Sequence, residues 1–398
     1  MSRKDDLSLA YFDISPERGF LSNPDPLTEM PKGWEYLDQV GNALPELLES
    51  GGLFNMARVL PIPSLESLNK LNRRELLLAW VRYSFIQSAY VHGRTKSEDP
   101  AIICRNIAIP AVTISKMLDV PPILQYFPYT LTNWKRKDPA GSIKVDNLEL
   151  IQTFSRDSDQ SWFNLIHVDI EYEAALALRS IYDSVLEMVT LEQAFTSIRI
   201  SLEQVVATMK RMPEGTNPET YYKIRRWIMP FKNVFYEGVS EQPGTLLRGQ
   251  SGAMTSFIQA LEAGLQMPEL EENELAMTLK DFRNYMPKGH RRFIEYLETY
   301  SRVRERTALS GRPSLIEQYD DCVEKILEFL SIHRGYAYYY IKQQTGDSMG
   351  TGNTNYLEYL GGRIRERWGR AFIKMRTESD FNIFAVRIDK MIRELLAA

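Results

Sequence analysis

The amino-acid sequence predicts an all-α protein built around a large helical bundle, and three observations carry this prediction. Apolar residues recur every three or four positions over most of the chain, which is the spacing of an amphipathic helix. Strong alternating strand patterns and Asn-Gly hairpin turns are missing from the sequence. Of the 398 residues, 44% are hydrophobic and 25% are charged, which is typical of an ordinary globular protein with a sizeable core.

A smaller, mostly helical N-terminal domain is expected over residues 1–115. Its first stretch, to about residue 33, is rich in Pro, Ser and Asp and should be extended. From Trp34 the apolar residues follow a helical period, and Pro45 should split this part into two short helices. A further helix is predicted over 73–92, where one face is apolar.

A larger helical domain is expected over residues 116–398. Four prolines should break the chain that leads into it into short pieces: Pro100, Pro110, Pro121 and Pro122. Apolar periods predict helices over 145–155, 160–190, 192–212, 219–229, 252–266, 272–284, 289–309 and 314–344. A Gly- and Thr-rich loop follows at 345–354, before a last helical part of mixed charge. Its composition favours a plain linker over a lid that closes on a ligand.

Composition and missing motifs exclude several classes of function. The net charge of −4 gives no footprint for nucleic acid, and no run of about 18 apolar residues predicts a membrane helix. The N-terminus has no signal-peptide pattern and the chain has two Cys, so we expect a cytoplasmic protein with reduced thiols. Nucleotide-binding, zinc-protease and serine-hydrolase motifs are missing, and the oligomeric state is not predicted.

The four histidines are the candidates for an imidazole ligand. His333 lies three residues after Leu330 and four before Ala337, on the apolar stripe of its helix. It is either a hydrogen-bonded core residue or an axial ligand of a haem iron. His167 lies on a similar stripe, and two inward imidazoles on separate helices favour a cofactor between them.

The other two histidines, His92 and His290, are expected to be structural. His92 ends a predicted helix, where a cation suits the helix dipole, and His290 begins one. Arg225 and Arg226 are either solvated surface charges or a clamp for a carboxylate, which an arginine can bind by two parallel hydrogen bonds.

Several spaced segments, in order along residues 10–375, resemble the indoleamine 2,3-dioxygenase family of haem proteins. The segments are 47–51, 89–93, 105–110, 120–126, 133–138, 281–287, 290–293, 321–333 and 350–354. The resemblance implies an all-α haem enzyme that uses O2. It also implies that the chain inserts both oxygen atoms across the indole C2–C3 bond of L-tryptophan or a close indole derivative.

The resemblance also implies a role for each matching residue. His333 would be the proximal ligand of the iron of haem b. Tyr126 and Phe163 would surround the substrate ring, and Ser251 would lie at the haem edge. Thr354 would hold the substrate ammonium group, and Arg225 or Arg226 would bind its carboxylate.

Three positions depart from the family pattern. The resemblance implies that the distal residue would be His167. This is similar to the related tryptophan 2,3-dioxygenases, where a histidine faces the indole N–H. Leu330 replaces a basic residue expected near a haem propionate, and Gln250 replaces a glycine. Three alternatives therefore stay open: monooxygenation or rearrangement of a modified indole, a non-catalytic oxygen carrier, and a helical interaction protein without a cofactor.

Overall fold

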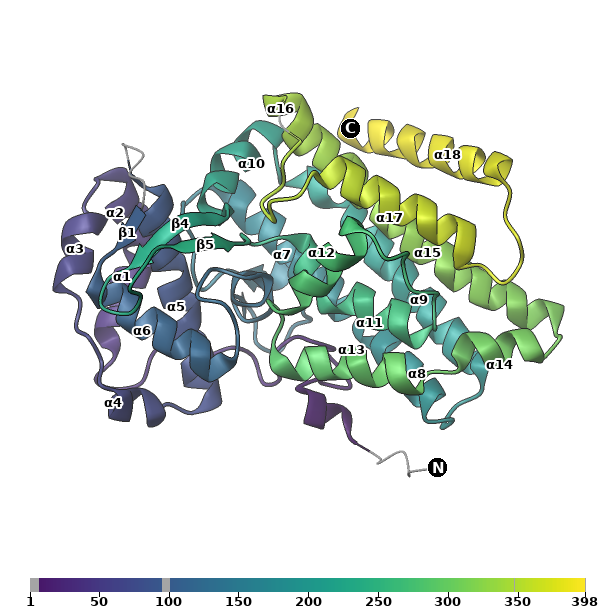
Figure 1. Ribbon diagram of the computed structural model, residues 1–398, viewed down its shortest axis with the longest axis horizontal. Coiled ribbons are helices and arrows are strands. Elements are labelled where there is room, and N and C mark those ends of the chain that lie inside the picture. Colours follow the sequence, from purple (N-terminus) through teal and green to yellow (C-terminus); the bar gives the residue numbers. More distant parts are fainter. Residues whose placement is uncertain (1–6, 95–100, 347, 398) are drawn as a thin grey trace.

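The computed structural model of the protein describes residues 7–94, 101–346 and 348–397 (Figure 1). These residues are mostly helical, so the predicted all-α class is confirmed. The α-helices are α1 (Glu35–Asn42), α2 (Leu44–Glu49), α3 (Leu53–Val59), α4 (Leu65–Asn69), α5 (Arg73–His92), α6 (Arg105–Leu118), α7 (Ser158–Glu173), α8 (Ala175–Val185), α9 (Leu191–Lys210), α10 (Pro218–Arg225), α11 (Ser256–Gly264), α12 (Glu274–Arg283), α13 (Lys288–Tyr300), α14 (Val303–Leu309), α15 (Pro313–Ala337), α16 (Gln343–Thr345), α17 (Tyr356–Arg370) and α18 (Glu378–Ala397).

Helix α15 is the central element of the larger helical part. It packs against α9 on one side and against α17 and α18 on another, as Figure 1 shows. Helices α7, α8 and α9 pack on one another, and α11 lies against α8 and α13. The apolar stripe of α15 is therefore covered by neighbouring helices, and Val323, Ile326 and Leu327 on it are fully buried.

Short strands, which the sequence did not predict, lie beside the first helices. They are β1 (Ala101–Ile103), β2 (Lys135–Arg136), β3 (Leu148–Glu149), β4 (Phe231–Tyr236) and β5 (Gly244–Leu247). Strand β4 pairs in parallel with β1 and antiparallel with β5, and this sheet packs against α5 and α6 at the left of Figure 1. The chain after α10 thus returns to the N-terminal part. Because β4 buries only some of its residues, it leaves no clear alternating pattern.

Several predicted elements agree with the structure, and their ends have local causes. Helix α5 has the predicted bounds, because Asn72 and Glu75 form a capping box at its start. Helix α9 begins at a second capping box, formed by Thr190 and Gln193. Pro45 lies in the first turn of α2, which separates α2 from α1 as predicted.

Two predictions about local structure are wrong. No α-helix forms over 145–155, where the structure has only a short 3-10 helix at Val145–Asn147. The Asn133 side chain takes both backbone hydrogen bonds of Gln152, at 2.8 and 2.9 Å. Pro110 does not break the chain but lies inside α6. That helix buries Ile107, Ala111 and Ile114 completely, and this burial offsets the one hydrogen bond that proline removes.

Two of the predicted long helices are each two shorter helices in the structure. The stretch 160–190 holds α7 and α8, which meet at Ala174, and 289–309 holds α13 and α14, which meet near Ser301. The predicted domain boundary between residues 115 and 116 falls inside α6, so the division into two domains stays a prediction. None of the described helices is long and apolar enough to cross a membrane.

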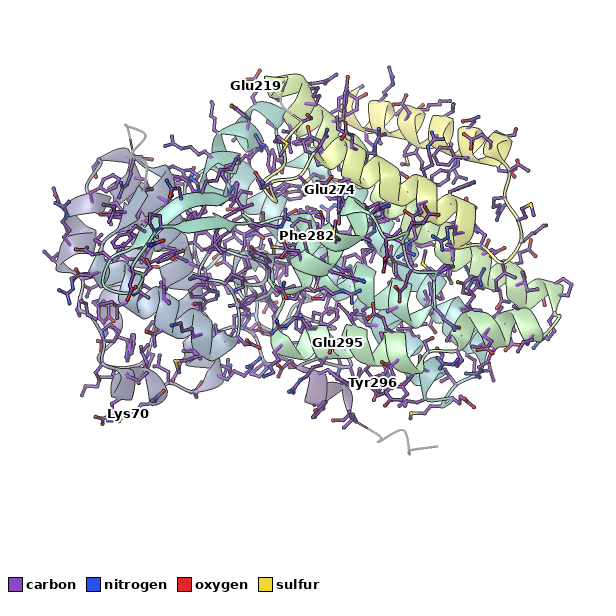
Figure 2. All side chains as sticks on the ribbon, viewed as in Figure 1. Lys70, Glu219, Glu274, Phe282, Glu295 and Tyr296 are labelled. Atoms are coloured by element: carbon purple, nitrogen blue, oxygen red, sulfur yellow. The ribbon has the colours of Figure 1, made fainter. Side chains whose placement is uncertain are left out.

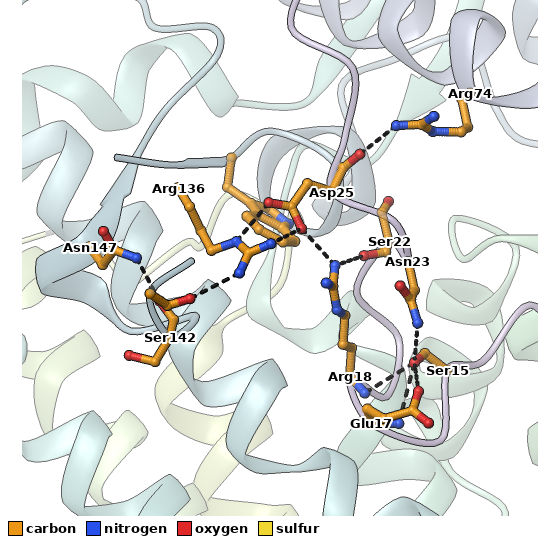
Figure 3. A network of polar contacts seen from close by, with 12 residues as sticks. Ser15, Glu17, Arg18, Ser22, Asn23, Asp25, Arg74, Arg136, Ser142 and Asn147 are labelled. Carbon is orange, nitrogen blue, oxygen red and sulfur yellow. Dashed lines mark hydrogen bonds and ion pairs between the residues drawn. The ribbon is translucent and has the colours of Figure 1, made fainter. Parts of the chain in front are cut away.

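Hydrogen bonds and ion pairs hold the N-terminal stretch against the rest of the protein (Figure 3). The Asp25 carboxylate accepts hydrogen bonds from Arg18 Nη1 at 2.7 Å and from Arg136 Nε at 2.8 Å. Arg74 of α5 donates to the Asp25 carbonyl oxygen at 2.7 Å. Three segments far apart in the sequence therefore meet at one residue.

Candidate cofactor and substrate site

A cavity with about 920 Å³ of space between atoms, part of it open to solvent, lies at the middle of the helical bundle. Its walls come from α7, α11, α15, α17, the segment before α11 and the loop before α17. A second pocket of about 410 Å³ adjoins it and shares His167 and His333.

His333 projects from α15 into this cavity, and no described residue forms a hydrogen bond with its ring. Burial, together with the charges of His167 and Arg363, lowers the pKa of His333 to about 4. The imidazole is therefore neutral at pH 7, with a free electron pair on a ring nitrogen. A buried, neutral imidazole without a partner is the donor that an axial site on a haem iron needs.

His167 projects from α7 into the same two pockets. Its Nδ1 lies 2.7 Å from the carbonyl oxygen of Phe163, one turn earlier on α7. Burial lowers the pKa of His167, although that hydrogen bond opposes the shift. Since Nδ1 of the neutral ring must donate to the carbonyl, Nε2 is an acceptor that faces the cavity.

Aromatic rings form the wall around His167. The Phe163 ring lies 4.8 Å from the His167 ring and 4.5 Å from the Tyr221 ring of α10, and all three residues line the cavity. Tyr126 does not line the cavity. Its ring is almost fully buried and lies 6.3 Å from the His167 ring. Tyr126 thus lies behind the wall in this structure, and contact with a substrate stays a prediction.

A buried carboxyl group lies behind the same wall. Glu171 Oε1 accepts hydrogen bonds from the Tyr126 hydroxyl at 3.0 Å and the Thr255 hydroxyl at 2.6 Å. Burial raises the pKa of Glu171 to about 7, and the two hydrogen bonds oppose the shift. Thr255 also lines the cavity, so it connects Glu171 to the site.

The segment before α11 forms another wall of the cavity. Ser251 lines it and caps a short turn by accepting a hydrogen bond from the Ala253 N–H at 3.3 Å. Gln250 lines it as well, so the departure from the family's glycine lies at the site itself. A Cβ atom added at Gly252 would lie 3.5 Å from His333 Nε2, so the backbone passes close to the proximal ring.

The Gly- and Thr-rich loop is a wall of the cavity rather than a plain linker. Gly350, Thr351, Gly352 and Thr354 all line the cavity, and Gly350 N–H donates to the Thr354 carbonyl oxygen at 2.7 Å. A Cβ atom added at Gly352 would lie 2.7 Å from the buried Phe282 ring of α12, which is labelled in Figure 2. Residue 347 of the predicted loop lies outside the described residues.

The two candidate arginines point in different directions, and neither lines the cavity. Arg225 is 5% exposed and donates a hydrogen bond to the Met349 carbonyl oxygen, in the loop that walls the cavity. Arg226 donates to the His92 carbonyl oxygen at 2.7 Å and lies over the Trp227 ring. The structure therefore brings Arg225 next to the site and directs Arg226 toward α5.

The two remaining histidines have structural partners. His92 Nε2 lies 3.1 Å from the Met229 carbonyl oxygen, and burial lowers its pKa to about 4. It is therefore neutral rather than the cation expected at a helix end, because burial outweighs the helix dipole. His290 Nδ1 lies 3.1 Å from the Ser256 hydroxyl, and burial lowers its pKa to about 3.

Several polar residues of the site were not predicted from the sequence. Among them are Glu171, Thr255 and Arg363, and Arg363 lines the cavity from α17. Glu171 follows His167 by one helical turn, so the helical period alone could have suggested it. Arg363 belongs to a segment rich in charges, in which nothing sets one arginine apart.

The residues present fit a bound haem. The described residues contain no group of three or more His, Cys, Asp or Glu side chains that could hold a metal ion by themselves. His333 offers one nitrogen donor and the cavity offers apolar walls, which include Phe329, Leu330 and Ile258. A macrocycle that brings its own iron and needs one protein ligand matches this donor set.

Comparison with known proteins agrees with this geometry. A family model described as "Indoleamine 2,3-dioxygenase" matches residues 8–371. Indoleamine 2,3-dioxygenase 1 of Mus musculus is 31% identical over 376 residues, which are 87% of this chain and 91% of that protein. Indoleamine 2,3-dioxygenase 2 of Homo sapiens is 30% identical over 340 residues, 82% of each chain. The 6-hydroxytryptophan 2,3-dioxygenase fscD of Fusarium equiseti is 24% identical over 353 residues, 83% of this chain and 84% of that protein.

Proposed function

Since the chain belongs to the indoleamine 2,3-dioxygenase family and is a haem-dependent dioxygenase of an indole compound, we propose that its substrate is L-tryptophan or a close derivative. The reaction adds both atoms of O2 across the indole C2–C3 bond and gives an N-formylkynurenine-type product. The observation that carries the proposal is the neutral, unpartnered His333 imidazole, which shares a cavity with His167.

His333 would hold the cofactor, which we propose to be haem b. When bound, this cofactor supplies the binding and activation of O2, which protein side chains cannot provide. The apolar walls of the cavity keep water away from the reacting groups. The protein's own contribution is then to orient the indole ring and its side chain.

The distal wall is suited to orient an indole. His167 Nε2 is an acceptor that faces the cavity, so it can receive the hydrogen bond of the indole N–H. Phe163 and Tyr221 offer ring faces against which the indole can pack. We propose that the Thr354 hydroxyl receives the substrate ammonium group and that Ser251 contacts the bound molecules at the cofactor edge.

The substrate carboxylate requires a cation, and we assign this role to Arg225 rather than Arg226. Arg225 lies one helical turn after Tyr221, which lines the cavity, so both side chains leave α10 on the same face. It also contacts the cavity loop at Met349. An arginine at that place can bind a carboxylate and hold the loop over the substrate.

A visible spectrum of the purified protein tests the proposal. The ferric and ferrous-CO forms of the wild type should show a haem spectrum, and His333→Ala should lose or strongly change it. The matched control is His290→Ala, a buried histidine away from the cavity, which should leave the spectrum unchanged. An unchanged spectrum of the His333 variant would refute the proximal ligand.

A second candidate function is monooxygenation or rearrangement of a modified indole. Two observations favour it: the polar His167 at the distal wall and the relative named 6-hydroxytryptophan 2,3-dioxygenase. Product masses from tryptophan and from ring-substituted tryptophans separate the candidates. A gain of two oxygen atoms supports dioxygenation, whereas a gain of one supports the monooxygenase alternative. Reversible O2 binding without turnover would support an oxygen carrier.

A further inference from the structure

A buried cluster of three charged side chains adjoins the cavity, and its charges do not balance. Glu262 of α11 lies between Arg363 and Arg367, one turn apart on α17, with each guanidinium nitrogen 2.9 Å from a carboxylate oxygen. The three side chains are 7%, 4% and 9% exposed, respectively. Among the described residues, Glu262 is the acid that pairs with either arginine, so one buried positive charge is left over.

Glu262 and Arg363 each favour the charge of the other despite their burial. Burial opposes the charge of Glu262, but Arg363 and Arg367 hold the pKa of its carboxyl below the usual value. Burial likewise opposes the charge of Arg363, but Glu262 holds its pKa above the usual value. A buried charge without a counter-ion is costly, so the cluster is suited to accept one more anion.

The anion can reach the cluster from the cavity. Arg363 lines the cavity, whereas Arg367 and Glu262 do not, and Arg363 Nε is buried without a hydrogen-bond partner among the described residues. Arg248, the other cation near this wall, is already paired with Asp281. Arg363 and His333 line the same cavity. The spare positive charge thus lies at the cavity in which the cofactor would be held.

We propose that Arg363 binds a carboxylate in the cavity and that this carboxylate is a propionate of the bound haem. Haem carries two propionates, and α15 offers them no cation in the turn before His333, where Leu330 and Phe329 line the cavity. Arg363, on the neighbouring helix α17, supplies the positive charge that α15 does not offer to the propionates. The inference rests on the proposed function, since it needs a haem held by His333.

The experiment titrates haem into the apoprotein and follows the Soret band, so its readout does not depend on turnover. Arg363→Met should weaken haem affinity by about 10- to 100-fold, the range of a hydrogen bond to a charged group. Arg363→Lys should recover part of the affinity, because it restores the charge. The matched control is Arg367→Met, which removes the same charge and the same contact with Glu262 but no side chain that lines the cavity.

A second measurement compares haem with its dimethyl ester, and its wild-type arm covers the case in which Arg363→Met fails to fold. The wild type should bind the dimethyl ester of haem about 10- to 100-fold more weakly than haem itself, and Arg363→Met should bind both about equally. Equal affinity of the wild type for haem and its ester would overturn the inference. Equal losses in the Arg363 and Arg367 variants would also overturn it, since they would show a general effect of charge.

The carboxylate could instead come from the substrate, and the same variants separate the two sources. If Arg363→Met binds haem normally but has a raised KM for tryptophan and not for tryptamine, the carboxylate belongs to the substrate and the propionate assignment is wrong. If the wild type takes up no haem at all, the proposed function fails, and this inference fails with it.

Discussion

At the scale of single residues, burial decides which protonation states the site can use. His333 and His167 are both neutral because they are removed from water, so each has a ring nitrogen free to accept or to ligate. The bond from His167 to the Phe163 carbonyl selects the nitrogen that faces the cavity. The histidine positions were visible in the sequence, but this choice of nitrogen was not.

The first prediction concerns His167. If its Nε2 accepts the indole N–H, His167→Ala should lower kcat/KM for tryptophan by about 3- to 10-fold, the range of one neutral hydrogen bond. The same substitution should have little effect on turnover of 1-methyltryptophan, which has no N–H to donate. A similar loss with both substrates would instead indicate that the imidazole acts on bound O2 or on the shape of the pocket.

The second prediction compares the neighbouring arginines. Arg225→Met should raise KM for tryptophan by about 10- to 100-fold, because a buried carboxylate loses a charged hydrogen bond. Arg226→Met is the matched control, since that side chain contacts His92 and Trp227 away from the cavity. A raised KM in Arg226→Met with an unchanged KM in Arg225→Met would instead assign the carboxylate to Arg226. Circular dichroism of both variants checks that each remains folded.

At the scale of elements, the site depends on close packing between segments that have little regular structure. The loop before α17 folds back on itself through the Gly350–Thr354 hydrogen bond and lies on α12 through Gly352. Arg248 donates to the Gly352 carbonyl oxygen at 2.8 Å, which adds a polar contact to this packing. The composition of the loop favoured a linker because glycine is common in linkers. In the structure, Gly352 instead permits the loop backbone to approach the Phe282 ring closely.

The third prediction tests this packing. Gly352→Ala places a methyl group 2.7 Å from Phe282, so the loop must shift and kcat/KM should fall. The free energy of unfolding should fall by only about 1 kcal/mol, since a surface loop can move away from the core. Gly362→Ala is the control, because its methyl group would meet no atom nearer than 3.7 Å, and it should be neutral or stabilising. Unchanged kinetics in Gly352→Ala would contradict the loop's role.

At the scale of the whole molecule, one continuous core holds the site, and polar side chains are buried within it. The core includes residues from Leu9 to Ile392, so the extended N-terminal stretch and the last helix both contribute to it. The pairing of β4 with β1 joins the segment that follows α10 to the N-terminal part of the chain. Stability should therefore respond to the titration of the buried acids.

The fourth prediction concerns the pH dependence of stability. Glu171 has a folded pKa of about 7 and an ordinary unfolded pKa of 4.5, so the folded state holds its proton longer. Stability should therefore fall as the pH rises from 4.5 to above 7, by about 3 kcal/mol from this group. Glu171→Gln, which stays neutral, should remove that part of the slope in urea unfolding curves. A slope that is the same in both proteins would show that Glu171 ionises normally.

The helical fold and the inward position of His333 were predictable from the sequence because both depend on local periodicity. Helix α5 has the predicted bounds, and the stripe around His333 does face the interior. The strands and the failed helix over 145–155 were not predictable in this way. Their backbone bonds go to partners distant in sequence, such as β1 with β4 and Gln152 with Asn133.

The sequence by itself determined the helical class, because apolar residues recur at helical spacing. It also determined the family resemblance and, through it, the candidate iron ligand His333, because both depend on residue types at given positions along the chain. Only the tertiary structure decided which of Arg225 and Arg226 lies beside the cavity, which ring nitrogen of His167 faces it, and that Arg363 supplies a charge to it. These depend on which helix faces lie against one another, and that arrangement is a property of the packed chain as a whole.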